Sequence, residues 1–289
     1  MKLDQGQLDA LSAAVAEGTF EAAARYLHVT PSAVSQRIKA LETAVGRVLL
    51  TRTKPIRPTP SGQTLLRVAR QLQTITAEAA HELGTGPPGL KAVIPVAVNA
   101  DSLATWFLPA LAAVGPSCAF DLRRADQDQT AEMLRDGTVM AAVTVQAEPV
   151  PGCTVQRLGR MRYRPRAAPS FAATWFPNGP TVAALAQAPV VCSDRQDQLQ
   201  ERYLRRRSRR RLYPPRHYVP GAADYARAIW LGLGWGMLPD LQAPPGDLLY
   251  FDPEHHVDVT LFWQRWRLRT TVLDRLSEAV QQASAGKLH

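Results

Sequence analysis

Two short amphipathic segments joined by a tight turn constrain this chain more than any other feature of its sequence. Residues 20–27 place apolar side chains on one face at helical spacing, and residues 31–45 do the same. Thr30 and Pro31 stand at the join, and a threonine cap followed by proline at the first helical position is a strong signal for the start of a helix. The pattern predicts a helix-turn-helix, with a further amphipathic helix before it over residues 4–17.

The outer face of the second segment is polar and basic, which suits contact with DNA bases. In a helix-turn-helix the N-terminal part of the second helix enters the major groove, where hydroxyl, amide and guanidinium groups bond to base edges. An ordinary helical hairpin with a solvated polar face is the alternative that the pattern leaves open. The candidate DNA-binding residues of this segment are Thr30, Pro31, Ser32, Ser35, Gln36, Arg37 and Lys39.

A small wing is predicted directly after these helices. Residues 49–58 read as a strand, a turn and a return, so that Arg52 and Arg57 are candidates for contact with phosphates or the minor groove. Thr59 repeats the signal of a cap followed by proline and is the last candidate DNA-binding residue. Residues 20–60 hold seven basic and two acidic side chains, a net +5 within a chain of net charge +9, which fits double-stranded DNA as a partner.

A long amphipathic helix is predicted over residues 60–83, with a narrow apolar stripe outside any compact core. Such a stripe usually pairs with a copy of itself, so we expect a homodimer or, by further association, a homotetramer with paired DNA half-sites. The expected division is a winged helix-turn-helix domain at 1–60, a linker helix and hinge at 61–90, and an effector-binding domain at 91–289.

Strands and helices alternate from residue 91 onward, which predicts an α/β fold with parallel sheets covered by helices. Strands are expected at 93–98, 119–123, 139–145 and 190–192 and from residue 218, and helices at 102–113, 129–135, 197–206, 222–231 and 271–283. Gly232, Gly234 and Gly236 follow a helix, whereas the glycines of a dinucleotide loop follow a strand. They therefore predict a tight turn from helix to strand.

The N-terminal region resembles the DNA-binding signature of LysR-type transcriptional regulators. The resemblance is carried by AAARYLHVTPSAVSQRIKALE at residues 22–42, by LLTR at 49–52 and by PTPSG at 58–62. It implies a winged helix-turn-helix with a long linker helix, followed by an effector domain that resembles a periplasmic binding protein.

The remainder of the chain is similar to that effector domain, in which two α/β lobes surround a cleft. The similarity implies a first lobe at about 91–161 and 267–289 and a second lobe at about 162–266. Three further segments resemble the lysine/arginine-responsive ArgP/LysG branch, namely residues 97–111, 175–179 and 188–191. This narrower resemblance implies a regulator that senses lysine or arginine, controls genes for amino-acid export or metabolism, and works with RNA polymerase.

A basic amino acid needs one site for its carboxylate and acidic groups for its cationic ones. A helix N-terminus favours a carboxylate, which makes Ser102 and Leu103 candidates. Aspartates near strand ends, where clefts form in α/β folds, are candidates for the cations, although capping a helix is the alternative role for each. These are Asp101, Asp126, Asp128, Asp194 and Asp224. Thr144, Val145, Gly221 and Ala222 complete the candidate effector-binding residues.

Two arginine-rich segments depart from the expected pattern. Residues 162–167 hold three arginines and Pro165 where an apolar strand is expected to open the second lobe, so that strand is expected at an edge or broken. Residues 202–211 hold seven arginines, for which a solvated helix face is the favoured interpretation. A position of this run beside the cleft would repel a cationic effector.

Other classes of protein fit the sequence less well. The chain has neither the Gly-x-Ser-x-Gly elbow of a hydrolase nor a phosphate loop, so an enzyme is not expected. Its three cysteines lack the spacing of a zinc site, so no cofactor or metal is expected, and no signal peptide or membrane span is apparent, which predicts a cytoplasmic protein without a membrane partner. A sequence-tolerant DNA-organising protein without an effector is the alternative that stays open.

Overall fold

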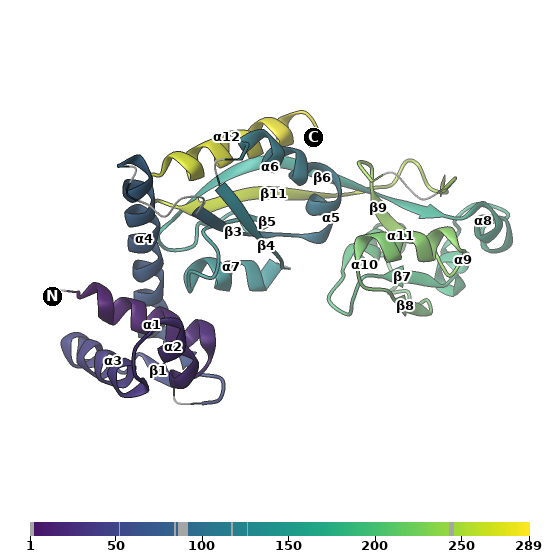
Figure 1. The fold of residues 1–289 in the computed structure, drawn as a ribbon. Coiled ribbons are helices and arrows are strands. Elements are labelled where there is room, and N and C mark those ends of the chain that lie inside the picture. The colour runs from purple at the N-terminus through teal and green to yellow at the C-terminus, as the bar shows by residue number, and fades with distance from the viewer. Residues whose placement is uncertain are drawn as a thin grey trace.

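The computed structural model describes residues 3–51, 53–83, 85, 92–116, 118–125, 127–242 and 246–289. Figure 1 shows an N-terminal helical domain, the long helix α4 beside it, and then two α/β lobes in succession. This arrangement confirms the predicted fold class of a winged helix-turn-helix followed by a two-lobed α/β domain.

The N-terminal domain forms as its local signals predict. Its elements are α1 (Gln5–Glu17), α2 (Phe20–Tyr26), α3 (Pro31–Val45), β1 (Leu50–Thr51) and β2 (Arg57–Pro58). The hydroxyl of Thr19 accepts from Ala22 N–H at 3.1 Å, and that of Thr30 accepts from Ala33 N–H at 3.2 Å, so each threonine caps the helix that follows it. Leu11, Val34 and Leu41 are among the fully buried side chains that pack these helices together.

Helix α4 (Pro60–Glu82) contacts both the N-terminal domain and the first lobe. Its first turns bury Leu65 and Leu66 in the core of the N-terminal domain. On another side the Arg67 guanidinium donates to the backbone oxygen of Pro151 at 2.7 Å, and Glu78 accepts from Thr271 N–H at 2.6 Å. The helix therefore connects the two domains through contacts as well as through the chain.

The large sheet has parallel and antiparallel parts and extends from the first lobe into the second. Its strands are β3 (Ala92–Val98), β4 (Cys118–Arg124), β5 (Ala141–Thr144), β6 (Cys153–Ala167), β9 (Gly236–Pro239), β10 (Leu249–Tyr250) and β11 (Val257–Trp266), in the order β10-β6-β11-β5-β3-β4 with β9 also paired to β6. β3 pairs in parallel with β4 and β5, as expected, whereas β11 pairs antiparallel with both β5 and β6. The expectation of wholly parallel sheets is wrong because the chain leaves the lobe along β6 and returns along β11.

Helices cover this sheet on both faces. They are α5 (Ala100–Ser102), the π-helical turn η1 (Leu103–Phe107), α6 (Leu108–Val114), α7 (Gln127–Arg135) and α12 (Thr271–Ala285). α6 and α12 lie together on one face, and α7 lies on the other (Figure 1). The helix expected at 102–113 is interrupted by the π-helical turn just before Pro109, a residue without an N–H to donate within a helix.

The second lobe is smaller and is built around aromatic side chains. Its elements are α8 (Pro169–Trp175), α9 (Val182–Gln187), β7 (Val190–Cys192), α10 (Leu199–Arg207), β8 (Arg216–Tyr218) and α11 (Ala222–Trp230), with β7 and β8 parallel. The rings of Tyr203, Trp235 and Phe251 meet edge to face in its core. The three glycines form the predicted turn from α11 to β9, where a Cβ on Gly236 would lie 2.6 Å from the Tyr225 hydroxyl.

The crossing strands β6 and β11 extend from one lobe into the other. They pair from Cys153–Trp266 to Tyr163–Val257. Residues 262–265 of β11 also pair with β5, a strand of the first lobe, although the expected boundary assigned them to the second. The two lobes are thus joined by a two-stranded antiparallel ribbon.

The arginine-rich segment of β6 is continuous strand, so of the two expected alternatives, a strand edge or a break, the break does not occur. Asp240 N–H donates to the backbone oxygen of Arg162, so the odd-numbered residues that follow have their backbone N atoms directed away from β9. On that other side β11 pairs only as far as Tyr163 and β10 only from Arg166. Pro165 therefore lies where its missing N–H removes no ladder bond.

We expect Gly62→Ala to destabilise the N-terminal domain. A Cβ at position 62 would lie 2.0 Å from the backbone oxygen of Leu49, an atom that cannot move aside without disturbing the wing. The cost in unfolding free energy should reach about 3 kcal/mol, the upper end of ordinary overpacking. Thermal unfolding measures it, with Gly286→Ala as the control, because the nearest atom to that Cβ is 4.0 Å away. Equal stability of the two variants would contradict this packing.

Candidate DNA-binding and effector-binding sites

The polar face of α3 is exposed, as a DNA-reading helix requires. Pro31, Ser32, Gln36 and Lys39 are exposed, and Ser35 and Arg37 are half-buried. The Thr30 hydroxyl caps the helix and bonds to the Ser32 hydroxyl at 2.9 Å. The residues predicted for base contact therefore lie along one accessible face, opposite the buried residues of the same helix.

The wing is held to the start of α4 by a side chain for which the sequence predicted another role. Thr59 was predicted to contact DNA, but its half-buried hydroxyl donates to the backbone oxygen of Val48 at 2.8 Å and accepts from Gly62 N–H at 3.1 Å. Arg57 is exposed on β2, and Arg52 lies outside the described residues. Exposed Arg47, just after α3, is a further basic side chain on this domain that sequence reasoning did not single out.

A cavity of about 610 Å³ lies between the two lobes and is lined by both. Of the predicted effector-binding residues it brings together Asp101, Thr144, Val145, Asp194, Gly221 and Ala222. Ser102 and Leu103 are outside its lining, as is Asp224, which is exposed on α11. Asp126 lies outside the described residues, and the side chain of Asp128 is not among those described.

Asp101 is held at the cavity by the crossing strand. The hydroxyl of Tyr163 on β6 donates to the Asp101 carboxylate at 2.8 Å. Burial, and next the Asp101 charge, hold the pKa of Tyr163 well above its usual value, so the hydroxyl stays protonated and able to donate. The helix that begins here is capped by the Asn99 side chain, which accepts from Ser102 N–H at 3.0 Å.

Sequence reasoning missed most of the cavity lining, including four side chains that can form hydrogen bonds or carry charge. Asp197, Tyr163, Tyr225 and Arg202 all face the cavity. Asp197 was read only as the start of a helix, and Tyr163 sat in a segment whose strand was in doubt. Only the parallel packing of β7 against β8 and the path of β6 bring these side chains to one cavity, so local sequence carried no signal for them.

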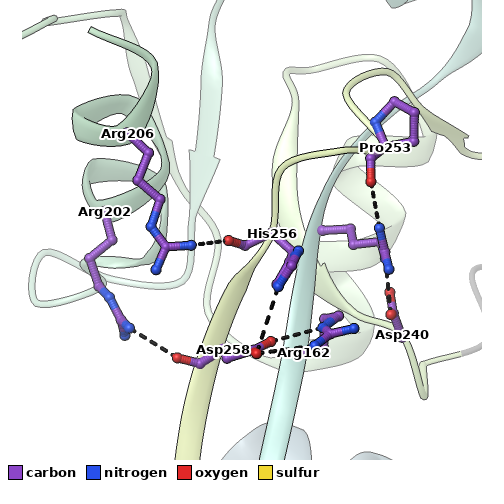
Figure 2. A network of polar contacts seen from close by, with 8 residues as sticks. Arg162, Arg202, Arg206, Asp240, Pro253, His256 and Asp258 are labelled. Carbon is purple, nitrogen blue, oxygen red and sulfur yellow. Dashed lines mark hydrogen bonds and ion pairs between the residues drawn. The ribbon is translucent and has the colours of Figure 1, made fainter.

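The arginines near the cavity are largely bound within the protein (Figure 2). Arg162 donates to both carboxylate oxygens of Asp258, at 2.9 and 3.1 Å, and so ties β6 to β11. Arg202 donates to the backbone oxygen of Asp258 at 3.0 Å, and Arg206 donates to that of His256. This arginine network fastens α10 of the second lobe to the crossing strands.

The arginine-rich segment at 202–211 was predicted to be a solvated helix face, and it is so only in part. Arg207 forms an ion pair with buried Asp252 at 3.1 Å, whereas Arg209 and Arg210 are exposed. Arg202 does line the cavity, as does Arg195. The described lining also holds the carboxylates of Asp101, Asp194 and Asp197, so its ionisable side chains sum to a net charge of −1.

Neither a metal site nor a membrane span is found in the part of the chain that the structure describes. No group of three His, Cys, Asp or Glu residues there is arranged to hold a metal ion. Among the helices of that part, none has the length and apolar character needed to cross a bilayer.

A winged helix-turn-helix joined through one long helix to a two-lobed ligand cavity defines the class of ligand-responsive transcriptional regulators. Residues 6–63 match the description "Bacterial regulatory helix-turn-helix protein, lysR family", and residues 91–285 match "LysR substrate binding domain". The chain belongs to the LysR family of transcriptional regulators. The similar proteins below are regulators rather than enzymes.

Several relatives are similar over nearly their whole length. The HTH-type transcriptional regulator LysG of Mycobacterium tuberculosis is 44% identical over 288 residues, covering 99% of this chain and 95% of the relative. The lysine export transcriptional regulatory protein LysG of Corynebacterium glutamicum is 41% identical, covering 96% and 97%. These matches confirm the predicted resemblance to the ArgP/LysG branch.

Solved structures agree with the sequence matches. ArgP from Mycobacterium tuberculosis superposes with a TM-score of 0.89 at 42% identity, covering 100% of this chain and 99% of that one. Full-length LysG from Corynebacterium glutamicum with bound effector Arg superposes with a TM-score of 0.83 at 38% identity, covering 99% and 100%.

We expect burial, together with the arginine network, to make stability depend on the protonation of His256. Burial, and next the Arg162 guanidinium, lower the pKa of His256. Because the folded pKa lies below the unfolded one, the unfolded chain binds more protons as the pH falls below about 6.5, and stability falls with it. The difference in unfolding free energy between wild type and His256→Gln should therefore shift against wild type between about pH 7 and pH 5.

Chemical denaturation at a series of pH values measures this difference. His217→Gln, at an exposed residue of β8 outside the network, is the matched control. A His256→Gln variant whose stability follows pH in parallel with wild type would contradict a lowered pKa of this imidazole.

Proposed function

We propose that this protein is a DNA-binding transcriptional regulator that senses a basic amino acid, lysine or arginine, and controls genes for amino-acid export or metabolism. The observation that carries the proposal is the cavity between the lobes, whose described lining is acidic on balance. Lysine and arginine carry a net positive charge, so this lining complements them, and the similarity to LysG with bound effector Arg supports the same assignment.

The effector's groups are assigned to the predicted residues that line the cavity. Asp101 attracts its ammonium groups, Asp194 adds negative charge on the second lobe's side, and the helix that begins after Asn99 presents its N-terminal end to the carboxylate. The walls are supplied by Thr144, Val145, Gly221 and Ala222. Neither a cofactor nor a metal has a part in this chemistry.

DNA is bound by the exposed face of α3 and by the wing. Ser32, Ser35 and Gln36 read base edges, and Arg57 holds the backbone. The protein acts as a homodimer or homotetramer in the cytoplasm, with RNA polymerase as a further partner. Dimer formation is supported by α4, on which Leu72 and Ile75 remain 41% and 45% exposed in the single chain.

In the proposed division of the chain, residues 1–60 bind DNA, residues 61–90 form the linker and residues 91–289 bind the effector. The signal passes between the last and the first of these parts through the contacts of β6 and α4. An effector that binds the closed cavity more tightly than the open one shifts the population of the two arrangements. Arg67 of α4 contacts Pro151 just before β6 begins, so a change at the crossing strands reaches the linker helix directly.

We expect thermal unfolding of the full chain to respond to lysine or arginine. At one hundred times its dissociation constant a ligand stabilises the state that it binds by about 2.7 kcal/mol. Glutamate and leucine, which lack the cationic side chain, should give no comparable rise. Stabilisation by none of the four would contradict the proposed effector class and would favour a DNA-organising protein without an effector.

We expect Gln36→Ala and Arg57→Ala to weaken DNA binding in different ways. Loss of the Gln36 amide removes a base contact, so the preference for a selected site over random DNA should fall by about 1–3 kcal/mol. Loss of the Arg57 charge removes a phosphate contact, so both affinities should fall together and the salt dependence should lessen. Fluorescence anisotropy at several salt concentrations measures both, and wild-type binding by the two variants would rule out this DNA-binding surface.

A further inference from the structure

Two aspartates from opposite lobes line the same cavity, and only one of them was apparent from the sequence. Asp101 stands at the start of α5 in the first lobe. Asp197 stands in the loop between β7 and α10 of the second lobe. The Tyr163 side chain of β6, the strand that joins the lobes, lines the cavity with them.

Asp197 is held in place by four neutral donors. One carboxylate oxygen accepts from the backbone N–H and hydroxyl of Ser193 at 3.0 and 3.3 Å, and from the Gln200 amide at 3.0 Å. The other accepts from Leu199 N–H at 3.0 Å. Neutral donors orient a carboxylate but leave its charge of −1 uncancelled.

The support beneath Asp197 is itself buried. Gln200 is fully buried, and its amide also donates to the Tyr225 hydroxyl at 2.9 Å. The Tyr225 hydroxyl in turn accepts from Met237 N–H at 2.9 Å, and Met237 belongs to β9, which pairs with β6. The Asp197 carboxylate is thus fixed by a buried side chain that is itself fixed by another. A carboxylate with a fixed position can select a ligand by the position of its charge.

Asp194 is the aspartate of this loop that the sequence predicted, and its carboxylate bonds to the loop's own backbone. One of its oxygens accepts from Gln196 N–H at 2.6 Å and from Asp197 N–H at 2.9 Å, so it shapes the loop around its neighbour. Burial most, then the Asp101 charge and less strongly the Asp197 charge, raise the pKa of Tyr163, whose side chain lines the cavity with both carboxylates.

We propose that Asp197 determines the specificity of the second lobe for a cationic side chain, and that one effector cation is shared between Asp197 and Asp101 across the cavity. This assignment rests on the proposed function and names the residues that select within it. Two like charges facing one cavity repel each other, and a cation between them replaces that repulsion with two attractions. A neutral analogue of the same length fills the space without that gain.

The test compares ligands that differ mainly in charge. Calorimetric titration of the full chain with lysine and with norleucine, which lacks the ε-amino group, gives a preference ratio, and arginine against citrulline gives a second. In Asp197→Asn the lysine/norleucine ratio should fall at least tenfold, in keeping with loss of a charge-assisted hydrogen bond. Asp101→Asn should lower the same ratio, and the double variant should bring it near one.

The controls separate recognition from folding. Asp247→Asn removes a charge from an exposed position of the second lobe outside the cavity and should leave the ratio unchanged. If Asp197→Asn does not fold, Asp197→Ser is the second variant, because its hydroxyl still accepts from the helix start. The lysine/norleucine ratio is the decisive quantity, because a purely structural role of Asp197 would weaken the binding of both ligands alike.

The outcomes distinguish this inference from the proposed function. A wild-type chain that prefers lysine, together with an Asp197 variant of unchanged ratio, overturns the assignment of Asp197 alone. A fall in the ratio for Asp194→Asn but not for Asp197→Asn transfers the role to Asp194 and also overturns it. A wild-type chain that binds none of the four ligands overturns both the inference and the proposed function.

Discussion

The antiparallel pairing of β6 with β11 is the interaction on which the rest of the molecule depends. The ribbon belongs to the sheet of the first lobe at one end and carries β9 and β10 of the second lobe at the other. Its near end begins beside Arg67 of the linker helix, and its far part places Tyr163 at the cavity. One continuous strand therefore runs from beside the linker helix to the ligand cavity.

Charge is distributed so that a basic protein keeps an acidic cavity. The guanidinium groups of the arginine network donate to Asp258 and to backbone oxygens. They lie beside a cavity whose described lining has a net charge of −1. The guanidinium of an arginine suits such fixed contacts because its donors lie in a rigid plane. The chain's high net charge is thus compatible with recognition of a cation within it.

Local signals predicted the N-terminal domain and most elements, but only part of the cavity lining. Thr30 and Pro31 mark the start of α3 because a cap acts within a few residues of itself. The arginines of β6 were misread because their acidic partners, Asp258 and Asp240, lie 96 and 76 positions away along the chain. Tyr163 and Asp197 were missed for the same reason, since only the folded path of β6 and β7 brings them together.

In the proposed mechanism, effector binding and DNA binding are coupled through one equilibrium between two arrangements of the chain. The most direct test is the dissociation constant of lysine for the full chain, measured with and without a saturating duplex selected by this protein from random sequence. Because coupling between sites is reciprocal, the account expects the constant to change by about fivefold or more when DNA is bound. The same constant in both conditions would contradict it and would leave two independent binding domains on one chain.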